Sequence, residues 1–152
     1  MQGKLGKFFA LALVSALFAF TLTAGKASAD EADVKYRQAV MKSLGGHMAS
    51  VVAIVKGQVD HKDHLAAHAD AIAGMGKIVK DIFPEGSDMA ADTKALPAIW
   101  EKPDDFAKAV AAFETASANL AKAADSGDMA AVGAALGPLG QSCGGCHKPF
   151  RQ

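Results

Sequence analysis

The sequence predicts an all-α fold, an antiparallel four-helix bundle, and three observations carry that prediction. Apolar residues recur at alternating steps of three and four, which is the repeat of a helix with one buried face. Strands would need alternating patterns or β-branched runs, and the sequence favours neither. Four helical segments, separated by glycine and proline, then need one another to bury their apolar faces.

Residues 1–29 predict a secretory signal peptide. Two lysines precede an almost wholly apolar stretch at residues 8–22, and Ala27-Ser28-Ala29 is a small-residue cleavage site. An uncleaved membrane anchor is the alternative, but the stretch is short for a span and ends in a processing site. We therefore expect export to the periplasm and one mature domain, residues 30–152.

The mature domain is mildly acidic. Cleavage after residue 29 removes three lysines and no acidic residue, which leaves 13 basic and 16 acidic residues among 123. That balance argues against a nucleic-acid-binding surface. The length suffices for one domain with a single core.

The first two helices are expected over residues 31–56 and 60–83. Gly57 ends the first, as glycine commonly does at helix C-termini. Asp60 is placed to cap the start of the second, and Pro84 stops it. The residues expected to face the core are, in the first helix, Arg37, Met41, Leu44, Met48, Val51 and Val55, and in the second, Leu65, His68, Ile72, Met75 and Val79.

A connection and two further helices follow. Residues 84–99 form a connection of unusual length for a compact bundle, which we expect to cover something, and Trp100 lies at its end. The third helix begins at Pro103, a favourable first-turn residue, and ends near Gly127. The fourth begins at Asp128. Core-facing residues are Phe106, Val110, Phe113 and Leu120 in the third helix and Val132, Leu136, Leu139, Cys143, Cys146 and Phe150 in the fourth.

The fourth helix carries the strongest chemical signal, Cys143-Gly144-Gly145-Cys146-His147, which uses both cysteines of the chain. This is the attachment signature of a c-type haem. Two thiols three positions apart lie on one helix face, so each can add across a vinyl group of the same porphyrin. The adjoining imidazole of His147 is then held beneath the iron. The motif predicts one covalently attached haem.

Other interpretations of the two cysteines are weaker. A structural zinc site needs about four nitrogen or sulfur ligands, and no second cysteine pair is available. A redox dithiol of the thioredoxin type would follow a strand. A disulfide between residues this close would stabilise little. A thiol-redox or metal-carrying module stays open as the alternative outside the haem interpretation.

Glycine is unusually dense in the fourth helix, although each glycine there costs about 1 kcal/mol relative to alanine. We expect a flat macrocycle that approaches the backbone closely to be the reason. Pro138 is expected to kink the same helix, because it removes one backbone hydrogen bond. The glycines are Gly133, Gly137, Gly140, Gly144 and Gly145.

Three segments resemble the cytochrome c-prime family, the class II c-type cytochromes: Val34-Lys35-Tyr36-Arg37-Gln38, Ala98-Ile99-Trp100 and residues 143–151. The last segment is highly specific, and the resemblance covers the mature chain. It implies a four-helix bundle that carries its haem near the C-terminus. It also implies that Cys143 and Cys146 form the thioethers and that His147 is the proximal iron ligand.

The resemblance further implies roles for three polar residues. Arg37 and Gln38 match a pair near the haem propionates, and Arg151 matches a basic residue packed by the proximal histidine. For Arg37 the residue chemistry agrees, because an arginine on an apolar face is costly unless it meets an anion. The alternative is an exposed arginine whose stem packs along the helix.

The sixth coordination position of the iron decides between two functions. Met41 lies where the family places the residue above the distal face, and a methionine ligand gives low-spin iron with a raised reduction potential. Without that ligand the iron would be five-coordinate and could bind a gas such as NO or CO. Methionine on an apolar face is also ordinary core material. Both alternatives stay open, with Met48 a poorer candidate ligand.

The preferred function is a single-electron carrier without substrate turnover, because no nucleophile, base and orienting group occur together. We expect redox partner proteins in the periplasm. The alternative is a gas-binding haem protein. Family members often form dimers through their first two helices, and Val52 and Ile54, expected to be exposed, would suit such a contact. An ordinary solvated helix is the other interpretation.

Three further histidines, His61, His64 and His68, are spaced at three and four and are expected to share a helical face. That spacing is compatible with a divalent metal site. The preferred interpretation is that His61 and His64 are solvated first-turn residues and that His68 is a partly buried member of the apolar face.

Overall fold

The computed structural model describes residues 24–89 and 92–152. The charged and apolar parts of the predicted signal peptide therefore lie outside the described residues. The long helices are α1 (Ala24–Val55), α2 (Leu65–Gly76), α4 (Pro103–Asp125) and α5 (Met129–Phe150). Shorter elements are α3 (Ala98–Glu101) and the 3₁₀ turns η1 (Lys62–His64) and η2 (Val79–Asp81).

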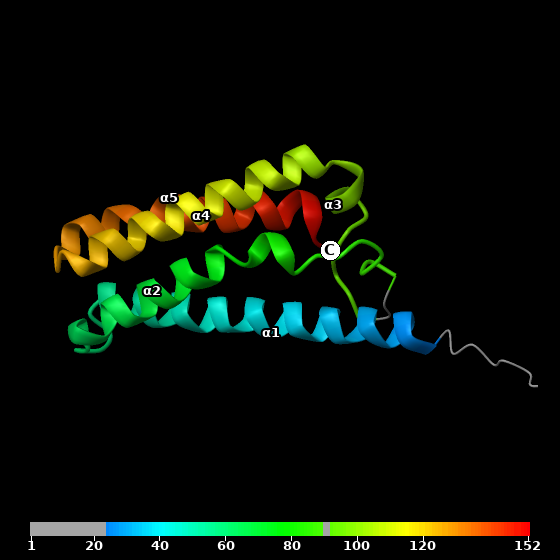
Figure 1. Ribbon diagram of the computed structural model, residues 1–152. Helices are drawn as coiled ribbons and strands as arrows, with labels where there is room; N and C mark the ends of the chain where they lie inside the picture. Colours follow the sequence, from blue (N-terminus) through cyan, green and yellow to red (C-terminus); the bar gives the residue numbers. More distant parts are fainter. Residues whose placement is uncertain (1–23, 90–91) are drawn as a thin grey trace, which may run out of the picture.

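The four long helices form a bundle, which confirms the predicted fold class. In Figure 1, α1 and α2 lie side by side, and α4 and α5 form the second pair. The shorter α2 packs on both α1 and α4, and so joins the two pairs. No helix in the described part of the chain has the length and apolar character needed to cross a membrane.

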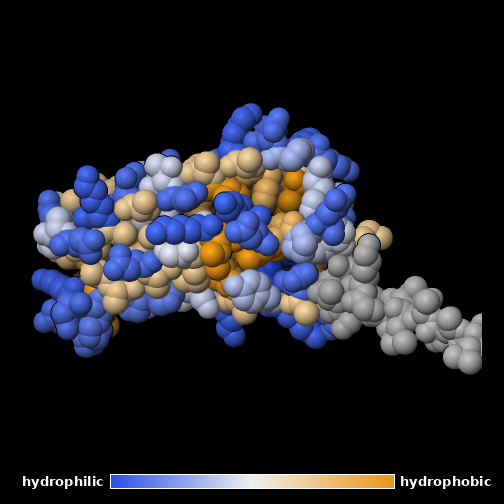
Figure 2. All heavy atoms as spheres, in the orientation of Figure 1, coloured by the Kyte–Doolittle hydropathy of each residue, from blue (hydrophilic) through white to orange (hydrophobic). Residues whose placement is uncertain are grey.

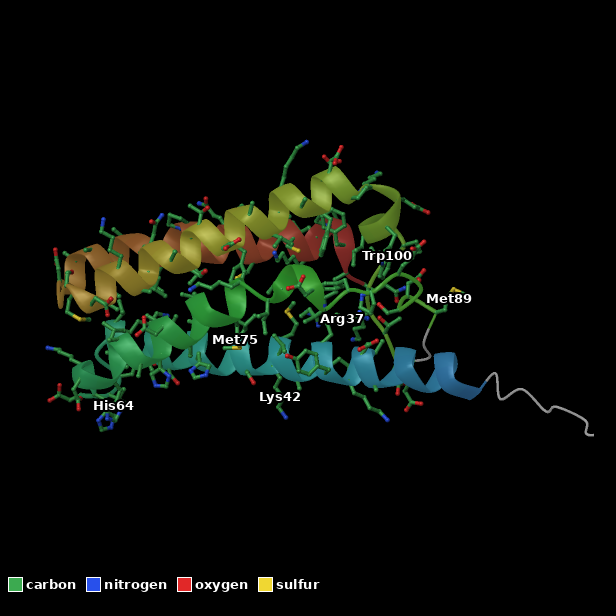
Figure 3. All side chains as sticks on the ribbon, viewed as in Figure 1. Arg37, Lys42, His64, Met75, Met89 and Trp100 are labelled. Carbon is green, nitrogen blue, oxygen red and sulfur yellow. The ribbon has the colours of Figure 1, made fainter. Side chains whose placement is uncertain are left out.

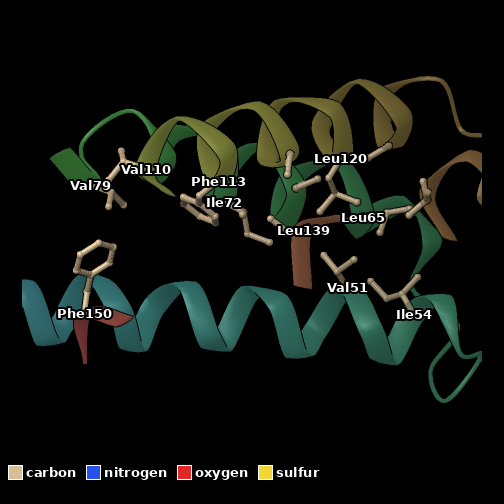
Figure 4. Close-up of a cluster of buried hydrophobic side chains, with 14 of the residues drawn as sticks. Val51, Ile54, Leu65, Ile72, Val79, Val110, Phe113, Leu120, Leu139 and Phe150 are labelled. Atoms are coloured by element: carbon tan, nitrogen blue, oxygen red, sulfur yellow. The ribbon is translucent and has the colours of Figure 1, made fainter. Parts of the chain in front are cut away.

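The core lies between the two pairs and is built from the apolar faces that the helical repeat predicts (Figure 4). Phe106, Val110, Phe113 and Leu120 of α4 are all buried. Burying a side chain of this size stabilises a protein by about 1.5–3 kcal/mol. Burial of these apolar helix faces against one another therefore holds the two helix pairs together. Partners from the other elements include Val51, Ile54, Leu65, Ile72, Val79, Val132, Leu139 and Phe150.

The second helix is shorter than predicted, so the expected range 60–83 is wrong. Asp60 makes no cap; His61 precedes η1, and no side chain caps that turn. The α-helix ends at Gly76, which is buried against α4: a Cβ added there would lie 2.8 Å from Ser117 Oγ. Glycine permits this close approach but is a weak helix former. The chain then continues through η2, which still buries Val79.

The prediction that Ile54 is exposed is also wrong. Ile54 is 3 % exposed and belongs to the core, whereas Val52 is half-buried. Ile54 lies three positions after Val51, and residues three apart share a helix face. The apolar face of α1 is therefore broader near its C-terminal end than predicted. Ile54 is unavailable for a dimer contact.

The start of α5 matches the prediction. The Asp128 carboxylate accepts hydrogen bonds from the backbone N–H groups of Ala130 (2.8 Å) and Ala131 (3.2 Å). Gly127 before it has a φ of 70°, which suits glycine at the end of α4. α5 then continues as one helix through Pro138, which lies at an exposed position.

Candidate functional site

Two adjoining cavities lie between α1, α4 and α5. The first has a volume of about 400 Å³ and the second about 260 Å³, and Met41, Cys146 and His147 line both. We call the pair the slot. Figure 2 shows hydrophobic side chains gathered in the middle of one face, ringed by hydrophilic ones. All seven residues predicted for the site line the slot: Arg37, Gln38, Met41, Cys143, Cys146, His147 and Arg151.

The two cavities differ in chemical character. Four basic residues and, among the described residues, no acidic one line the first cavity: Arg37, Lys42, Lys94 and Arg151. The second cavity is lined mainly by apolar side chains, including those of Leu44, Met48, Ile72, Val79, Phe113 and Leu139. A ligand with an anionic end and an apolar body matches this division.

The two cysteines lie on the slot side of α5. Both are free thiols and half-buried. Burial raises the pKa of Cys143 and of Cys146, and the neighbouring Cys143 adds to the rise at Cys146. A redox dithiol needs the opposite, because the thiolate is the nucleophile and a lowered pKa supplies it. These thiols therefore lack the electrostatics of a thiol-redox centre.

His147 lies in the last turn of α5, where its imidazole is held close to the slot. Partial burial lowers its pKa, and the positive charge of Arg151 lowers it further. The neutral imidazole is the form that binds a metal. The end of the helix is tied down, because Leu96 N–H donates to the Phe150 carbonyl (3.0 Å) and Gln152 N–H to the Lys94 carbonyl (2.9 Å). His147 is thus presented by an anchored turn.

Arg37 is 5 % exposed, although it is charged. Its guanidinium donates to Ser87 Oγ (2.8 Å), to Thr93 Oγ1 (2.8 Å), and to the carbonyls of Ser87 (3.2 Å) and Ile82 (3.3 Å). It also lies 4.8 Å from the centre of the Phe83 ring. Burial lowers the pKa of Arg37. The anion expected for Arg37 is not among these acceptors, which are all neutral.

The connection after η2 covers the first cavity, as its length suggests. Thr93, Lys94 and Ala95 line the cavity wall. Gln38 Nε2 donates to the Asp92 carbonyl (2.8 Å), which adds a second tie between α1 and this connection. Trp100 of α3 donates from its indole Nε1 to the Phe83 carbonyl (3.3 Å).

Three packed aromatic rings line the first cavity. Phe106 packs edge-to-face on Phe83, with ring centroids 5.0 Å apart, and on Phe150, with centroids 5.3 Å apart. Such pairs stabilise by about 0.5–1.5 kcal/mol beyond the area that they bury. The wall beside Cys146 and His147 is therefore rigid and apolar.

Ser87 and Thr93 were not predicted as site residues. Ser87 is fully buried and follows Gly86, whose φ of 85° makes the turn. The one signal in the sequence is indirect: a buried arginine requires acceptors, and hydroxyl groups in the long connection can supply them. Nothing local marks which hydroxyl groups do so.

The structure separates the three histidines that were expected to share one helix face. His68 Nδ1 lies 2.9 Å from Nδ1 of His47 on α1. His61, directly before η1, and His64, in η1, instead stack on each other. The expectation is wrong because the first turn of the segment is 3₁₀ rather than α-helical, which changes the angle between successive side chains.

Comparisons with known proteins agree on one family. A profile of the family described as Cytochrome C' matches residues 32–151. The chain is similar to cytochrome c' from Pararhodospirillum photometricum (45 % identity over 123 residues, 80 % of this chain and 98 % of the relative). It is also similar to cytochrome c-556 from Agrobacterium tumefaciens strain II Chrys (39 % identity over 120 residues, 78 % and 96 %).

Solved structures give the same result. Cytochrome c prime from Shewanella frigidimarina superposes with a TM-score of 0.75 at 32 % identity, covering 81 % of this chain and 96 % of that one. A nitric oxide complex of a mutant cytochrome c prime from Alcaligenes xylosoxidans superposes with a TM-score of 0.74 at 29 % identity, covering 81 % and 96 %.

Proposed function

Because the chain belongs to the cytochrome c' family, whose members carry covalently attached haem c, we propose that it transfers single electrons in the periplasm. When bound, haem c supplies an iron that takes up and releases one electron. The observation that carries the proposal is the position of Met41. Its thioether on α1 and the His147 imidazole on α5 line the same two cavities. Methionine and histidine as axial ligands give a raised reduction potential, which favours electron transfer.

The slot fits the cofactor on independent grounds. Cys143 and Cys146 are free, lie on one helix and border the cavities. Apart from the chain neighbours and the backbone of α5 itself, no atom of the described residues lies within 4 Å of a Cβ added at Gly144 or Gly145, so no other element packs against the backbone between the thiols. We propose that these two thiols attach the haem and that neutral His147 is the proximal iron ligand.

Arg37, Gln38 and Arg151 are proposed to hold the carboxylate end of the haem. The hydrogen-bond acceptors of Arg37 are all neutral and the one carboxylate that acts on its charge is that of Asp33, so an anion in the first cavity would be further stabilised by the guanidinium. Arg151 and Gln38 line the same cavity. Arg37 and Gln38 also fix the covering connection. Arg37 and Gln38 are therefore proposed both to bind the cofactor and to hold the connection in place over it.

Intact-mass measurement of the exported protein tests the attachment. We expect a chain that begins at Asp30 and carries the added mass of one haem. A Cys143→Ser/Cys146→Ser variant should be exported without covalently bound haem, as shown by haem staining of a denaturing gel. A wild-type chain of haem-free mass would contradict the proposal and support the thiol-redox or metal-carrying alternative.

A gas-binding haem protein is the second candidate, and the apolar second cavity favours it. Leu44, Met48 and Phe113 line a space that could accept NO or CO if Met41 stayed away from the iron. Absorption spectra of the purified protein decide between the two. Electron transfer predicts low-spin ferric and ferrous states. A high-spin ferrous state that takes up CO readily would favour gas binding.

The proposal includes redox partner proteins and no substrate turnover. Periplasmic location rests on the predicted signal peptide, and fractionation of cells with a haem stain tests it. A homodimer through α1 and α2 is retained as part of the proposal, although Ile54 no longer supports it. Sedimentation of the purified protein measures that association directly.

A further inference from the structure

Four of the five histidines of the chain lie in the segment from α1 to α2 rather than in the motif on α5: His47 on α1, His61 directly before η1, His64 in η1 and His68 on α2. They form two separate pairs. His47 and His68 join α1 to α2 inside the helix pair. His61 and His64 lie at the turn between these helices and are exposed to solvent. The proposed electron transfer through the haem requires neither histidine pair.

The 3₁₀ geometry of η1 brings the exposed pair together. Residues three apart eclipse each other in a 3₁₀ turn, so the His61 and His64 side chains project in the same direction. Their ring centroids lie 4.9 Å apart with an interplanar angle of 9°, and because the lone pair of each imidazole nitrogen lies in the plane of its ring, a ring must rotate for both to bind one ion, which exposure at the surface allows. The turn is closed by the His64 N–H, which donates to the His61 carbonyl (3.0 Å). It is anchored by Leu65, which is 2 % exposed.

Asp63 completes a three-ligand group. Its Oδ2 lies 3.6 Å from His64 Nε2. One ligand atom from each of His61, Asp63 and His64 lies within 4.8 Å of the others. Two imidazoles and a carboxylate are a donor set suited to divalent transition metals such as Zn²⁺ and Cu²⁺. Exposure leaves the remaining coordination positions to water.

We propose that His61, Asp63 and His64 form a surface site for a divalent transition metal ion. The site is separate from the haem slot: in Figure 3, His64 lies at one end of the α1–α2 pair and Arg37, which lines the slot, lies toward the other. His68 takes no part, because its Nδ1 is directed at His47. Metal binding should therefore leave the haem spectrum unchanged.

Calorimetric titration of the ferric holo-protein with Zn²⁺, and electron paramagnetic resonance with Cu²⁺, test the site. We expect one saturable equivalent and nitrogen hyperfine structure from two imidazoles. His61→Ala/His64→Ala should weaken binding by more than about tenfold, and Asp63→Asn should weaken it less, because a neutral amide keeps an oxygen donor. The matched control is His68→Gln, which should bind like wild type. Circular dichroism verifies that each variant keeps its helices.

Three results would overturn the site. The first is the absence of saturable binding to the wild type. The second is unchanged affinity in His61→Ala/His64→Ala. The third is a loss of metal affinity in His68→Gln as large as in that double variant, which would show that the metal binds at the His47–His68 pair instead.

Discussion

The Arg37 guanidinium donates a 2.8 Å hydrogen bond to Ser87 Oγ, 50 positions further along the chain. This bond joins the first helix to the connection that covers the haem slot. Both residues are buried, Ser87 completely. One side chain thereby supports the cover of the slot and places a positive charge at its wall. Substitution of Arg37 should therefore affect stability as well as haem binding.

Arg37→Ala should destabilise the holo-protein by about 2–4 kcal/mol, because hydrogen bonds to charged groups contribute about 1.5–3 kcal/mol and the Ser87 hydroxyl would lose its partner. Gln38→Ala is the control. Its amide is exposed and makes one hydrogen bond to the connection, so the loss should stay below about 1 kcal/mol. Denaturant unfolding measures both. Equal losses in the two variants would show that the buried guanidinium does not secure the connection.

Gly76→Ala should destabilise the bundle by about 1–3 kcal/mol, since the added methyl group would meet Ser117 Oγ at 2.8 Å and force this buried hydroxyl out of its hydrogen bond to the Glu114 carbonyl or disturb the packing of α2 on α4. Gly74→Ala is the matched variant, because an added Cβ there meets nothing within 4 Å. It should be neutral or stabilise by up to about 1 kcal/mol through helix propensity. Thermal unfolding of both proteins tests the contact. A Gly76→Ala protein as stable as Gly74→Ala would contradict the close approach.

The His47–His68 pair should make stability fall below neutral pH. Burial lowers the pKa of His68, and the nearby His47 and His64 lower it further, from an ordinary value of 6.5. The unfolded chain therefore takes up a proton at His68 before the folded chain does, so stability is complete above pH 6.5 and falls as the pH drops below it. His68→Gln should flatten this dependence. Unfolding at about pH 7.5 and 5.5 provides the comparison, and parallel losses in the two proteins would exclude His68 as the cause.

Regular helices and the haem motif could be predicted from the sequence because their signals are local. The α4 face from Phe106 to Leu120 follows the helical repeat, and the Asp128 cap lies beside the N–H groups that it binds. The attachment motif is five consecutive residues. Each of these features depends on residues that lie close together in the sequence, so the sequence alone reveals it.

Features that depend on tertiary contact could not be predicted. Gly76 at the end of α2 lies in close contact with Ser117 of α4, and Ile54 is buried in the core cluster that several elements share. The acceptors of Arg37 lie 45 to 56 positions away, and nothing near them marks their role. Sequence reasoning therefore found seven residues that line the slot but missed Thr93, which also lines it, and Ser87, and these two hold its cover.

CO uptake by the ferrous Met41→Ala and Met48→Ala variants tests whether Met41 is the sixth ligand of the iron. Met41 lines both cavities with His147, whereas Met48 lines only the second. If Met41 is the sixth ligand, ferrous wild type and Met48→Ala stay low-spin and take up CO poorly. Met41→Ala should become high-spin and bind CO readily, with a lowered reduction potential. A high-spin wild type, with spin state and CO uptake unchanged in Met41→Ala, would contradict Met41 ligation.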